Sequence, residues 1–318
     1  MFKYTYKNKL AYYLEELNVN SKFNIIDIGA KEDIGETLKI IPENQLNIYG
    51  FEPNKIEFEK LIKKFPQRKY FNIGVFNNKK NKRLYVTKEP AASSFFKPNN
   101  KNKIYEKINW KNRKIVKITK IKCDKLDSFS KVIKEIDFLK IDTQGSEYQI
   151  LEGAKKVLNS NSPLVLTETW STEIYKNINL FDEIIFLMKK MKYRVLDIDT
   201  AAASWKLETK NKFSDLDIPI KNGFEILFVK DYEILKKLEE NKIIKLIILL
   251  DLFGYKSFAC HLLEKNKNIS KKNYLCIYKK INYLNTIDKL LSIFPINILI
   301  KILVRYKIIK PINPQLHY

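Results

Sequence analysis

The segment DFLKIDTQGSEYQILEGA, residues 137–154, constrains the fold of this chain more than any other stretch. Its first part, FLKI at 138–141, is a short apolar run with one polar residue, which is typical of a buried strand. The following DTQG predicts a tight turn, and apolar residues then recur at helical spacing. In open α/β sheets, ligands bind where a strand passes into a helix in this way. We therefore expect Asp142 and Glu147 to lie in a ligand-binding crevice.

The same alternation of strands and helices continues on both sides of this segment. Apolar, β-branched stretches predict strands, and polar turns or helical patterns separate many of them. The predicted strands are 23–28, 47–51, 70–75, 138–141, 164–169, 194–199 and 225–229. Helices are predicted over 56–65 and 180–191. This alternation favours an α/β fold with a largely parallel sheet.

Between residues 76 and 122 the pattern changes, because polar and apolar residues alternate with a period of two. This alternation indicates half-exposed antiparallel strands at 83–87 and 114–122, which we expect at the edge of the sheet. The stretch PAASSFFKPNN between them is rich in small and turn-forming residues and predicts a loop. Such a loop either covers a site or simply connects strands.

Strand patterns stop after residue 230. Residues 231–318 are rich in lysine, isoleucine and leucine, so we expect a basic helical extension that follows an α/β domain over 1–230. The extension should break near Gly254 and Pro295, and its apolar runs are shorter than the roughly 20 residues that a membrane span needs. A helical cap on the domain, an oligomer contact and an interfacial helix are three interpretations that the sequence allows. The interfacial helix would be anchored by Lys301, Arg305, Lys307 and Lys310.

The chain carries a formal net charge of +23, from 59 Lys and Arg against 36 Asp and Glu. A charge of this size would suit a nucleic acid or an anionic membrane surface as a partner. The basic residues are mostly Lys, however, and they are spread along the whole chain. This distribution favours a lysine-coated surface over a dedicated nucleic-acid patch.

Histidine and cysteine usage narrows the chemistry. The three Cys residues lie far apart with no CxxC pair, so neither a disulfide framework nor a zinc site is indicated. No secretory signal is visible, and a cytoplasmic protein is expected. The two histidines, His261 and His317, both lie in the last quarter of the chain. An imidazole base is therefore excluded from the α/β part, where carboxylates, Lys or Tyr must serve.

The ends of the first two predicted strands indicate a nucleoside-binding crevice. The first strand passes from Asp27 into Gly29, and the second ends at Glu52. A glycine in the first turn lets the backbone approach a ligand, and an acidic side chain after the second strand can accept hydrogen bonds from ribose hydroxyls. In a purely structural interpretation, Asp27 would cap the next helix and Glu52 would begin one.

Phosphate-binding motifs are missing from this crevice. The turn GAKEDIG lacks the GxGxxG spacing of dinucleotide sites, and the sequence contains no P-loop. Glu32 and Asp33 in this turn would also repel phosphates. An adenosine ligand that carries a positive sulfonium fits an acidic rim better, and S-adenosylmethionine is such a ligand.

The residues resemble the FkbM-like family of class I S-adenosylmethionine-dependent methyltransferases, over roughly residues 20–230. The resemblance is carried by FNIIDIGA, IYGFEPN, AASSFFKPN, LVLTETW and above all DFLKIDTQGSEYQILEGA. In the first turn, Lys31, Glu32 and Asp33 stand where many members have Asn or Arg followed by Gly. The resemblance implies a Rossmann-like fold with a mostly parallel seven-stranded sheet and an inserted antiparallel excursion, followed here by the helical C-terminal extension.

The resemblance also implies the cofactor and the reaction. S-adenosyl-L-methionine would donate its methyl group to a hydroxyl of a small-molecule or glycan acceptor, as in polysaccharide modification. The expected cofactor-binding residues are Asp27, Gly29 and Ala30 at the methionine portion, Glu52 at the ribose, Val75 near the adenine, and Asp142.

A hydroxyl nucleophile needs a positioned base, which is worth roughly 10²- to 10⁴-fold in rate. The expected candidates are the carboxylates Asp142, Glu147 and Glu168, with Asp142 as the first choice. Mutual repulsion among them would raise the pKa of one carboxylate. Three carboxylates could instead bind Mg²⁺, an interpretation that we do not favour. In the structural alternative, Glu147 caps its own helix and Glu168 pairs with a surface Lys.

Two other functions fit parts of the sequence. The net charge suggests an RNA methyltransferase, with Trp110, Arg113 and Lys114 as a small stacking patch. The atypical GAKEDIG turn and the basic extension suggest a non-catalytic, membrane-peripheral protein with a methyltransferase-like domain.

Overall fold

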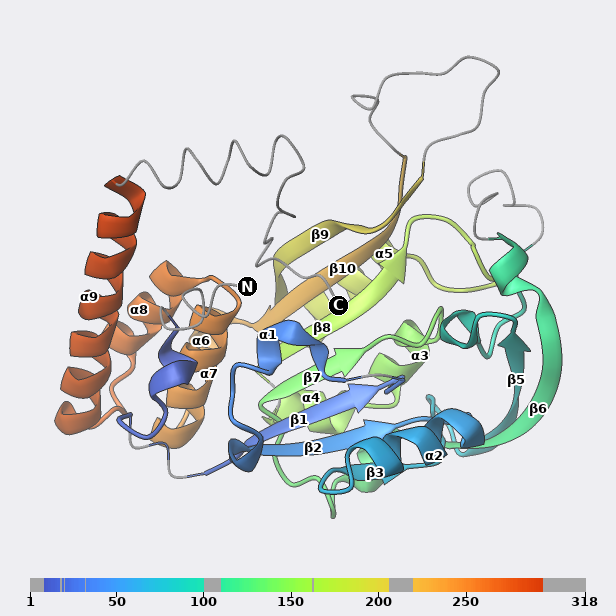
Figure 1. The fold of residues 1–318 in the computed structure, drawn as a ribbon, viewed down its shortest axis with the longest axis horizontal. Helices are drawn as coiled ribbons and strands as arrows, with labels where there is room; N and C mark the ends of the chain where they lie inside the picture. The colour runs from blue at the N-terminus through green and yellow to red at the C-terminus, as the bar shows by residue number, and fades with distance from the viewer. Residues whose placement is uncertain are drawn as a thin grey trace. The chain divides into compact units, whose positions relative to one another are not determined.

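The computed structural model of the protein describes residues 9–17, 19, 21–31, 33–99, 110–161, 163–205 and 220–293. Its central feature is a seven-stranded sheet with the order β3-β2-β1-β7-β8-β10-β9 (Figure 1). These strands are β1 Phe23–Ile28, β2 Leu46–Phe51, β3 Lys69–Phe71, β7 Phe138–Ile141, β8 Leu164–Trp170, β9 Tyr193–Trp205 and β10 Ile220–Lys230. The predicted α/β fold with a mostly parallel seven-stranded sheet is confirmed.

One strand of this sheet runs against the predicted direction. β2 pairs in parallel with β3, and β7 pairs in parallel with both β1 and β8. β10, in contrast, runs antiparallel between β8 and β9. The prediction that 225–229 continues the parallel pattern is therefore wrong. A strand in the middle of a covered sheet is apolar whichever way it runs, so composition does not reveal its direction.

The antiparallel excursion forms a separate three-stranded sheet with the order β4-β6-β5. Its strands are β4 Gly74–Val75, β5 Lys80–Thr87 and β6 Ile115–Asp124. β5 and β6 pair antiparallel as predicted, but they do not extend the edge of the main sheet. The predicted strand 70–75 is divided between the two sheets. β3 ends at Phe71 and β4 begins at Gly74, so Asn72 belongs to neither strand. The Nδ2 of Asn72 donates to the carbonyl oxygen of Glu52 at 2.9 Å.

One face of the main sheet is covered by the helices that follow β7 and β8 (Figure 1). The helices of this unit are α2 Lys55–Lys64, α3 Glu147–Glu152, α4 Lys155–Asn161 and α5 Phe181–Lys190. The core on this face joins Leu139 and Val165 from the strands to Leu151, Leu158 and Leu187 from α3, α4 and α5. Each such side chain stabilises the fold by about 1.5–3 kcal/mol. Alternate strand residues face the other side, where Asp27 of β1 is in register with Lys140 of β7.

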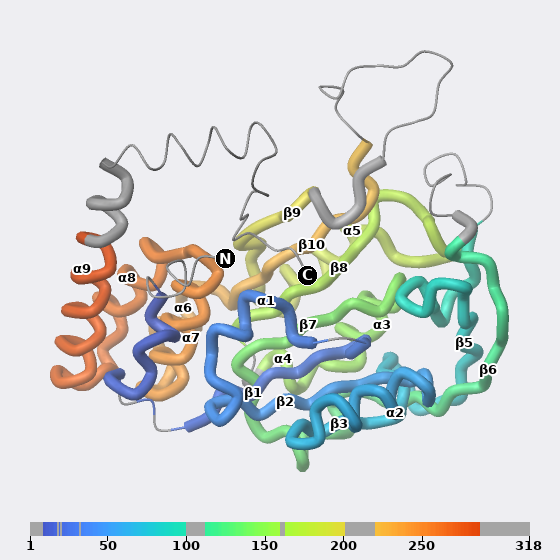
Figure 2. Tube along the Cα trace, viewed as in Figure 1, coloured from blue at the N-terminus to red at the C-terminus, as the bar shows by residue number. Residues whose placement is uncertain are grey.

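The chain divides into two compact units. The first comprises residues 23–33 and 47–231, and the second comprises 1–22, 34–46 and 232–318. The helices of the second unit are α1 Gly35–Leu38, α6 Tyr232–Leu235, α7 Glu240–Leu252, α8 Lys256–Lys265 and α9 Lys271–Ile293 (Figure 2). The domain boundary predicted at residue 230 stays a prediction, because this unit also includes residues that precede β2.

Within the second unit, α7 is the buried helix. The backbone N–H of Leu10 donates to Asp251 Oδ2 at 2.7 Å, and Lys245 Nζ donates to the carbonyl oxygen of Lys22 at 2.8 Å. These bonds fasten the segment before β1 to α7. The predicted break at Gly254 lies between α7 and α8, where φ is +96°. The break at Pro295 and the predicted basic anchor residues lie outside the described residues.

In the described ranges, no helix combines the length and the apolar character that crossing a membrane requires.

Candidate active site

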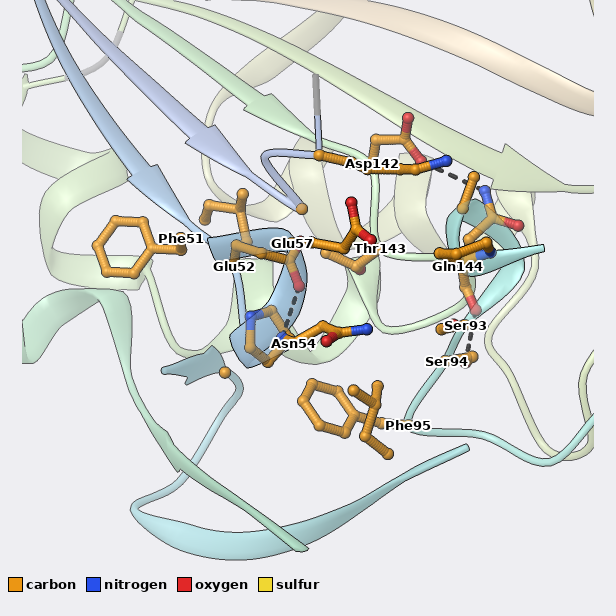
Figure 3. Close-up of a pocket in the computed structure, with 18 of the residues that line it drawn as sticks. Phe51, Glu52, Asn54, Glu57, Ser93, Ser94, Phe95, Asp142, Thr143 and Gln144 are labelled. Atoms are coloured by element: carbon orange, nitrogen blue, oxygen red, sulfur yellow. Dashed lines mark hydrogen bonds between the residues drawn. The ribbon is translucent and has the colours of Figure 1, made fainter. Parts of the chain in front are cut away.

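A cavity of about 70 Å³ lies at the carboxyl ends of β1, β2 and β7 (Figure 3). Four residues predicted to bind the cofactor line it: Gly29, Glu52, Val75 and Asp142. Another part of the wall comes from residues 90–95, so this loop covers the site and does more than connect strands. The remaining predicted residues, Asp27 and Ala30, are buried but are not among the lining residues.

The first turn after β1 ties three strand ends together. Gly29 has a φ of +87°, a conformation that favours glycine. Its N–H donates to the carbonyl oxygen of Phe51 at 3.0 Å, and the N–H of Asp142 donates to the carbonyl oxygen of Ile28 at 2.9 Å. The ends of β1, β2 and β7 therefore meet at one point of the cavity wall.

The charges of the first turn are paired within the same unit. Asp33 Oδ1 accepts from Arg68 Nη1 at 2.6 Å, so its charge is largely compensated and repels an anion less than the sequence suggested. Lys31 Nζ lies 3.0 Å from Glu89 Oε1, which links the first turn to the start of the covering loop. Glu32 lies outside the described residues.

Glu52 is a buried carboxyl group at the end of β2, with 7% of its surface exposed. Its Oε1 accepts the backbone N–H of Asn54 at 2.6 Å (Figure 3). Burial raises the pKa of Glu52 to about 8, against the lowering effect of the Asn54 N–H, and the nearby Glu57 adds to the rise. Asn54 caps α2 through its side chain, so the structural interpretation that Glu52 begins this helix is wrong. Glu52 does not cap α2, and it is one of the residues that line the cavity.

Asp27 likewise does not cap a helix, because it lies within β1 and the residue that precedes α1 is Ile34.

The covering loop is bonded to the turn after β7. Ser94 Oγ donates to the carbonyl oxygen of Gln144 at 2.7 Å and also accepts the N–H of Phe96 (Figure 3). Phe95 closes against β4, since a Cβ built at Gly74 would fall 2.6 Å from the Phe95 ring. Val75, next to Gly74, is 2% exposed and offers an apolar wall to the cavity.

Glu147 holds the turn between β7 and α3. Its carboxylate accepts the N–H of Thr143 at 2.9 Å, the N–H of Gly145 at 2.8 Å and the Thr143 hydroxyl at 3.0 Å. Burial raises the pKa of Glu147 to about 7, although these hydrogen bonds act in the opposite direction. The side chain is 1% exposed and is not among the residues that line the cavity. Its contacts are those of a group that fixes the turn.

Asp142 is one of the residues that line the cavity, and 37% of its side chain is exposed. Lys140 Nζ lies 3.8 Å from Asp142 Oδ2 and 3.9 Å from Asp27 Oδ1. Burial acts to lower the pKa of Lys140, but the surrounding acidic groups, of which Asp27 and Asp142 act most strongly, together raise it, so the amine stays charged. For Asp27, burial raises the pKa in spite of Lys140. The buried amine of Lys140 thus partly compensates the negative charge of Asp27 and Asp142.

Glu168 lies beside Asp142 at the end of β8. Gln144 Nε2 donates to both carboxyl groups. Burial raises the pKa of Glu168 well above its usual range, and the charge of Asp142 raises it further. The carboxyl group of Glu168 therefore accepts from Gln144, which differs from the surface Lys pair of the structural alternative.

Sequence reasoning missed Glu225, which lies directly across from Glu168 in the β8 and β10 ladder. Burial raises the pKa of Glu225 to about 8, with a further contribution from Asp142. Because β10 is antiparallel, its first half lies at the edge of the sheet where the parallel strands end. A parallel strand would have placed Glu225 at the opposite edge. The signal was the acidic residue in an otherwise apolar strand, EILFV.

Across the described part of the chain, no group of three or more His, Cys, Asp or Glu side chains is arranged to hold a metal ion. The three cysteines, Cys123, Cys260 and Cys276, are free thiols.

The proposed stacking patch for RNA loses one of its members. Arg113 is only 7% exposed, and its Nη1 donates to Gln144 Oε1 at 3.3 Å and to the hydroxyl of Tyr175. Its guanidinium lies over the Trp170 ring, 5.4 Å from the centroid. Arg113 therefore packs inside the unit and is not available to stack on a base.

Comparison with known proteins places this chain in a family. The profile of the methyltransferase FkbM domain matches residues 27–195. No protein with a curated description matches the chain.

Similar solved structures share low sequence identity with the chain. They include a TehB-like SAM-dependent methyltransferase from Corynebacterium glutamicum, with 10% identity, a TM-score of 0.34, and coverage of 70% of this chain and 88% of that one. A precorrin-6y C5,15-methyltransferase from Geobacter metallireducens has 11% identity, a TM-score of 0.34, and coverage of 69% and 85%. An rRNA methylase from Streptococcus thermophilus has 8% identity, a TM-score of 0.33, and coverage of 70% and 95%.

Proposed function

Since this chain belongs to the methyltransferase FkbM domain family, we propose that it methylates a hydroxyl group of a carbohydrate or a related small acceptor. The chain is an S-adenosylmethionine-dependent methyltransferase. We propose in addition that the acceptor atom is a hydroxyl oxygen, that the acceptor is a carbohydrate or a related small molecule, and that the residues named below form the site.

The residues around the cavity suit S-adenosylmethionine. Glu52 offers a buried carboxyl group to the ribose hydroxyls, and Gly29 lets the backbone come close to the methionine portion. Val75 and Phe95 form an apolar wall for the adenine. Asp27 and Ala30 support the turn that carries Gly29. When bound, the cofactor supplies an electrophilic methyl group on a positive sulfonium.

Asp142 is proposed as the base. Asp142 lines the cavity, and its carboxylate would take the proton of the acceptor hydroxyl as that oxygen is methylated. A positioned base contributes roughly 10²- to 10⁴-fold to such a reaction. Lys140, 3.8 Å away, compensates the charge of Asp142 before the proton arrives. Holding the two reactants in line adds the entropic advantage of an intramolecular reaction.

Glu168 and Glu147 are proposed to act next to the base. Burial raises the pKa of Glu168, which favours its protonated form, and its carboxyl group shares the donor Gln144 Nε2 with Asp142. Glu147 keeps the turn that carries Asp142 in shape. The observation that carries the proposal is the position of Asp142, which lines the cavity and shares the donor Gln144 Nε2 with the carboxyl group of Glu168.

The proposal is tested by methyl transfer from S-adenosylmethionine labelled with tritium in the methyl group. The acceptor panel contains oligosaccharides, nucleotide sugars and total RNA, with the full chain and the Asp142→Asn variant in parallel. Label should enter a carbohydrate as an alkali-stable methyl ether, and the variant should leave it unlabelled. Label found in RNA alone would replace the carbohydrate proposal with the RNA alternative.

We further propose that residues 1–230 carry this activity in the cytoplasm, and that the basic extension 231–318 makes peripheral contact with an anionic membrane. The lysines of this extension are part of the chain's net charge of +23 and would be attracted to such a membrane. Flotation of the full chain with vesicles that contain phosphatidylserine, at low and high salt, tests it. Equal flotation with neutral vesicles would contradict the electrostatic part of the proposal.

A further inference from the structure

Gln144 lies next to the proposed base, Asp142, but has no role in the reaction proposed above. It is the third residue of the DTQG turn and has a φ of +59°. Its side chain lies at the cavity wall, between the carboxyl groups of the site and the covering loop (Figure 3). Both ends of its amide are hydrogen-bonded. The Nε2 donates to Asp142 Oδ1 at 3.3 Å and to Glu168 Oε2, and the Oε1 accepts from Arg113 Nη1 at 3.3 Å.

The orientation of this amide is fixed by the groups around it. Arg113 has only donors, so it requires the oxygen end of the amide. The hydroxyl of Tyr175, which accepts from Arg113, also lies 3.0 Å from Gln144 Oε1. The nitrogen end, with its two hydrogens, then faces two carboxyl oxygens. A flipped amide would place its oxygen against both carboxyl groups and its hydrogens against the guanidinium.

We infer that Gln144 is a positioning residue that holds the Asp142 and Glu168 carboxyl groups side by side and keeps Asp142 directed at the acceptor. This inference rests on the proposed function of Asp142 as the base. The amide nitrogen donates to both carboxyl groups, and the amide oxygen accepts from the buried guanidinium of Arg113.

The same residue connects the carboxyl pair to the loop that lines the cofactor cavity. Ser94 Oγ donates to the Gln144 carbonyl oxygen at 2.7 Å, and the Tyr175 hydroxyl lies 2.9 Å from the carbonyl oxygen of Ala92. A displacement of the loop at Ala92 or Ser94 would therefore displace Gln144 as well. Gln144 contacts the loop through its backbone carbonyl and through Tyr175, and it contacts Asp142 through its side-chain amide.

Several charged groups act on Glu168, and the test must separate Gln144 from them. They are Asp142, Glu147 and Glu225, which raise the pKa of Glu168, and Lys140, whose own pKa Glu168 raises. Substitution of Gln144 leaves all four in place. Gln144→Glu replaces the two donor hydrogens with an acidic oxygen, whereas Gln144→Met keeps the length of the side chain and removes the hydrogen bonds.

The experiment is a pH titration of the full chain labelled with ¹³C at the glutamate side-chain carboxyls, without cofactor or acceptor. The Glu168 signal is assigned by its loss in Glu168→Gln. Gln144→Glu should increase the proton affinity of Glu168 about tenfold, a shift of about one pH unit, and Gln144→Met should give a smaller shift in the same direction. Gln67→Glu, which adds the same charge at an exposed turn, should leave the midpoint unchanged.

Equal Glu168 midpoints in the parent, Gln144→Glu and Gln144→Met would overturn the inference. If Gln144→Glu does not fold, as judged by circular dichroism, the Gln144→Met shift decides alone. Because the titration contains no S-adenosylmethionine, failure of the proposed function would appear in cofactor binding and would not change this result.

Discussion

The carbonyl oxygen of Asp142 lies where a side chain on Gly29 would begin, since a Cβ built at Gly29 falls 1.9 Å from that oxygen. The contact brings the end of β7 against the first turn after β1. It places the proposed base and the backbone at the proposed methionine site in the same part of the cavity wall. Glycine at residue 29 is therefore required both by its φ of +87° and by this contact.

Gly29→Ala should remove S-adenosylmethionine binding and lower the free energy of unfolding by at least about 3 kcal/mol, because the methyl group must displace the end of β7. Gly254→Ala is the matched control. Gly254 has a similar φ of +96°, but a Cβ there meets nothing within 4 Å. Gly254→Ala should lower the free energy of unfolding only by the conformational strain of about 1–2 kcal/mol, and it should preserve cofactor binding. Urea unfolding and calorimetry measure the two effects, and equal losses in both variants would contradict the steric argument.

Asp142→Asn should leave the dissociation constant of S-adenosylmethionine nearly unchanged and lower turnover about 10²- to 10⁴-fold, because the amide cannot accept the hydroxyl proton. Turnover is measured with the acceptor found in the labelling panel. Asp182→Asn, at an exposed position in the first turn of α5, is the control and should keep full turnover. Full activity of Asp142→Asn would show that Asp142 is not the base and that another group accepts the proton.

Cofactor affinity should depend on pH through Glu52. Burial raises the pKa of this carboxyl group to about 8, so much of it is protonated at neutral pH and is a poorer acceptor for ribose hydroxyls. Affinity for S-adenosylmethionine should therefore rise as the pH increases toward 8, up to about tenfold per pH unit. Glu52→Gln should bind more weakly at the upper end of this range and show a flatter profile. Glu59→Gln on the exposed side of α2 should follow the parent, and a parent profile as flat as that of Glu52→Gln would refute the assignment.

Stability should fall as the pH rises, because Glu225 has a raised pKa in the folded state. Its folded value of about 8 lies above the ordinary value of 4.5, so its protonated form favours folding. This contribution is fully present below about pH 4.5 and is lost as the pH rises through about 8. Glu225→Gln should reduce the loss of unfolding free energy between about pH 5 and pH 9 by a few kcal/mol at most, since the group is partly exposed. Urea denaturation at several pH values measures this loss, and parallel stability curves for parent and variant would contradict a raised pKa of Glu225 in the folded state.

The strands that enclose the site could be predicted from the sequence because each is a short apolar run closed by a turn. Gly29, Glu52 and Asp142 follow such runs, and the cavity brings all three together. Glu225 could not be found in this way, because apolar composition does not state the direction of β10. The contacts of Glu147 and Gln144 were also beyond the sequence, since they depend on the conformation of the DTQG turn.

Calorimetric titration of the full chain with S-adenosylmethionine, in parallel with Glu52→Ala, shows whether the chain binds the cofactor through Glu52. We expect one binding event per chain for the parent and strongly weakened binding for Glu52→Ala, because the variant loses the acceptor for the ribose hydroxyls. No heat from the parent at saturating cofactor, or equal dissociation constants for the two proteins, would contradict it.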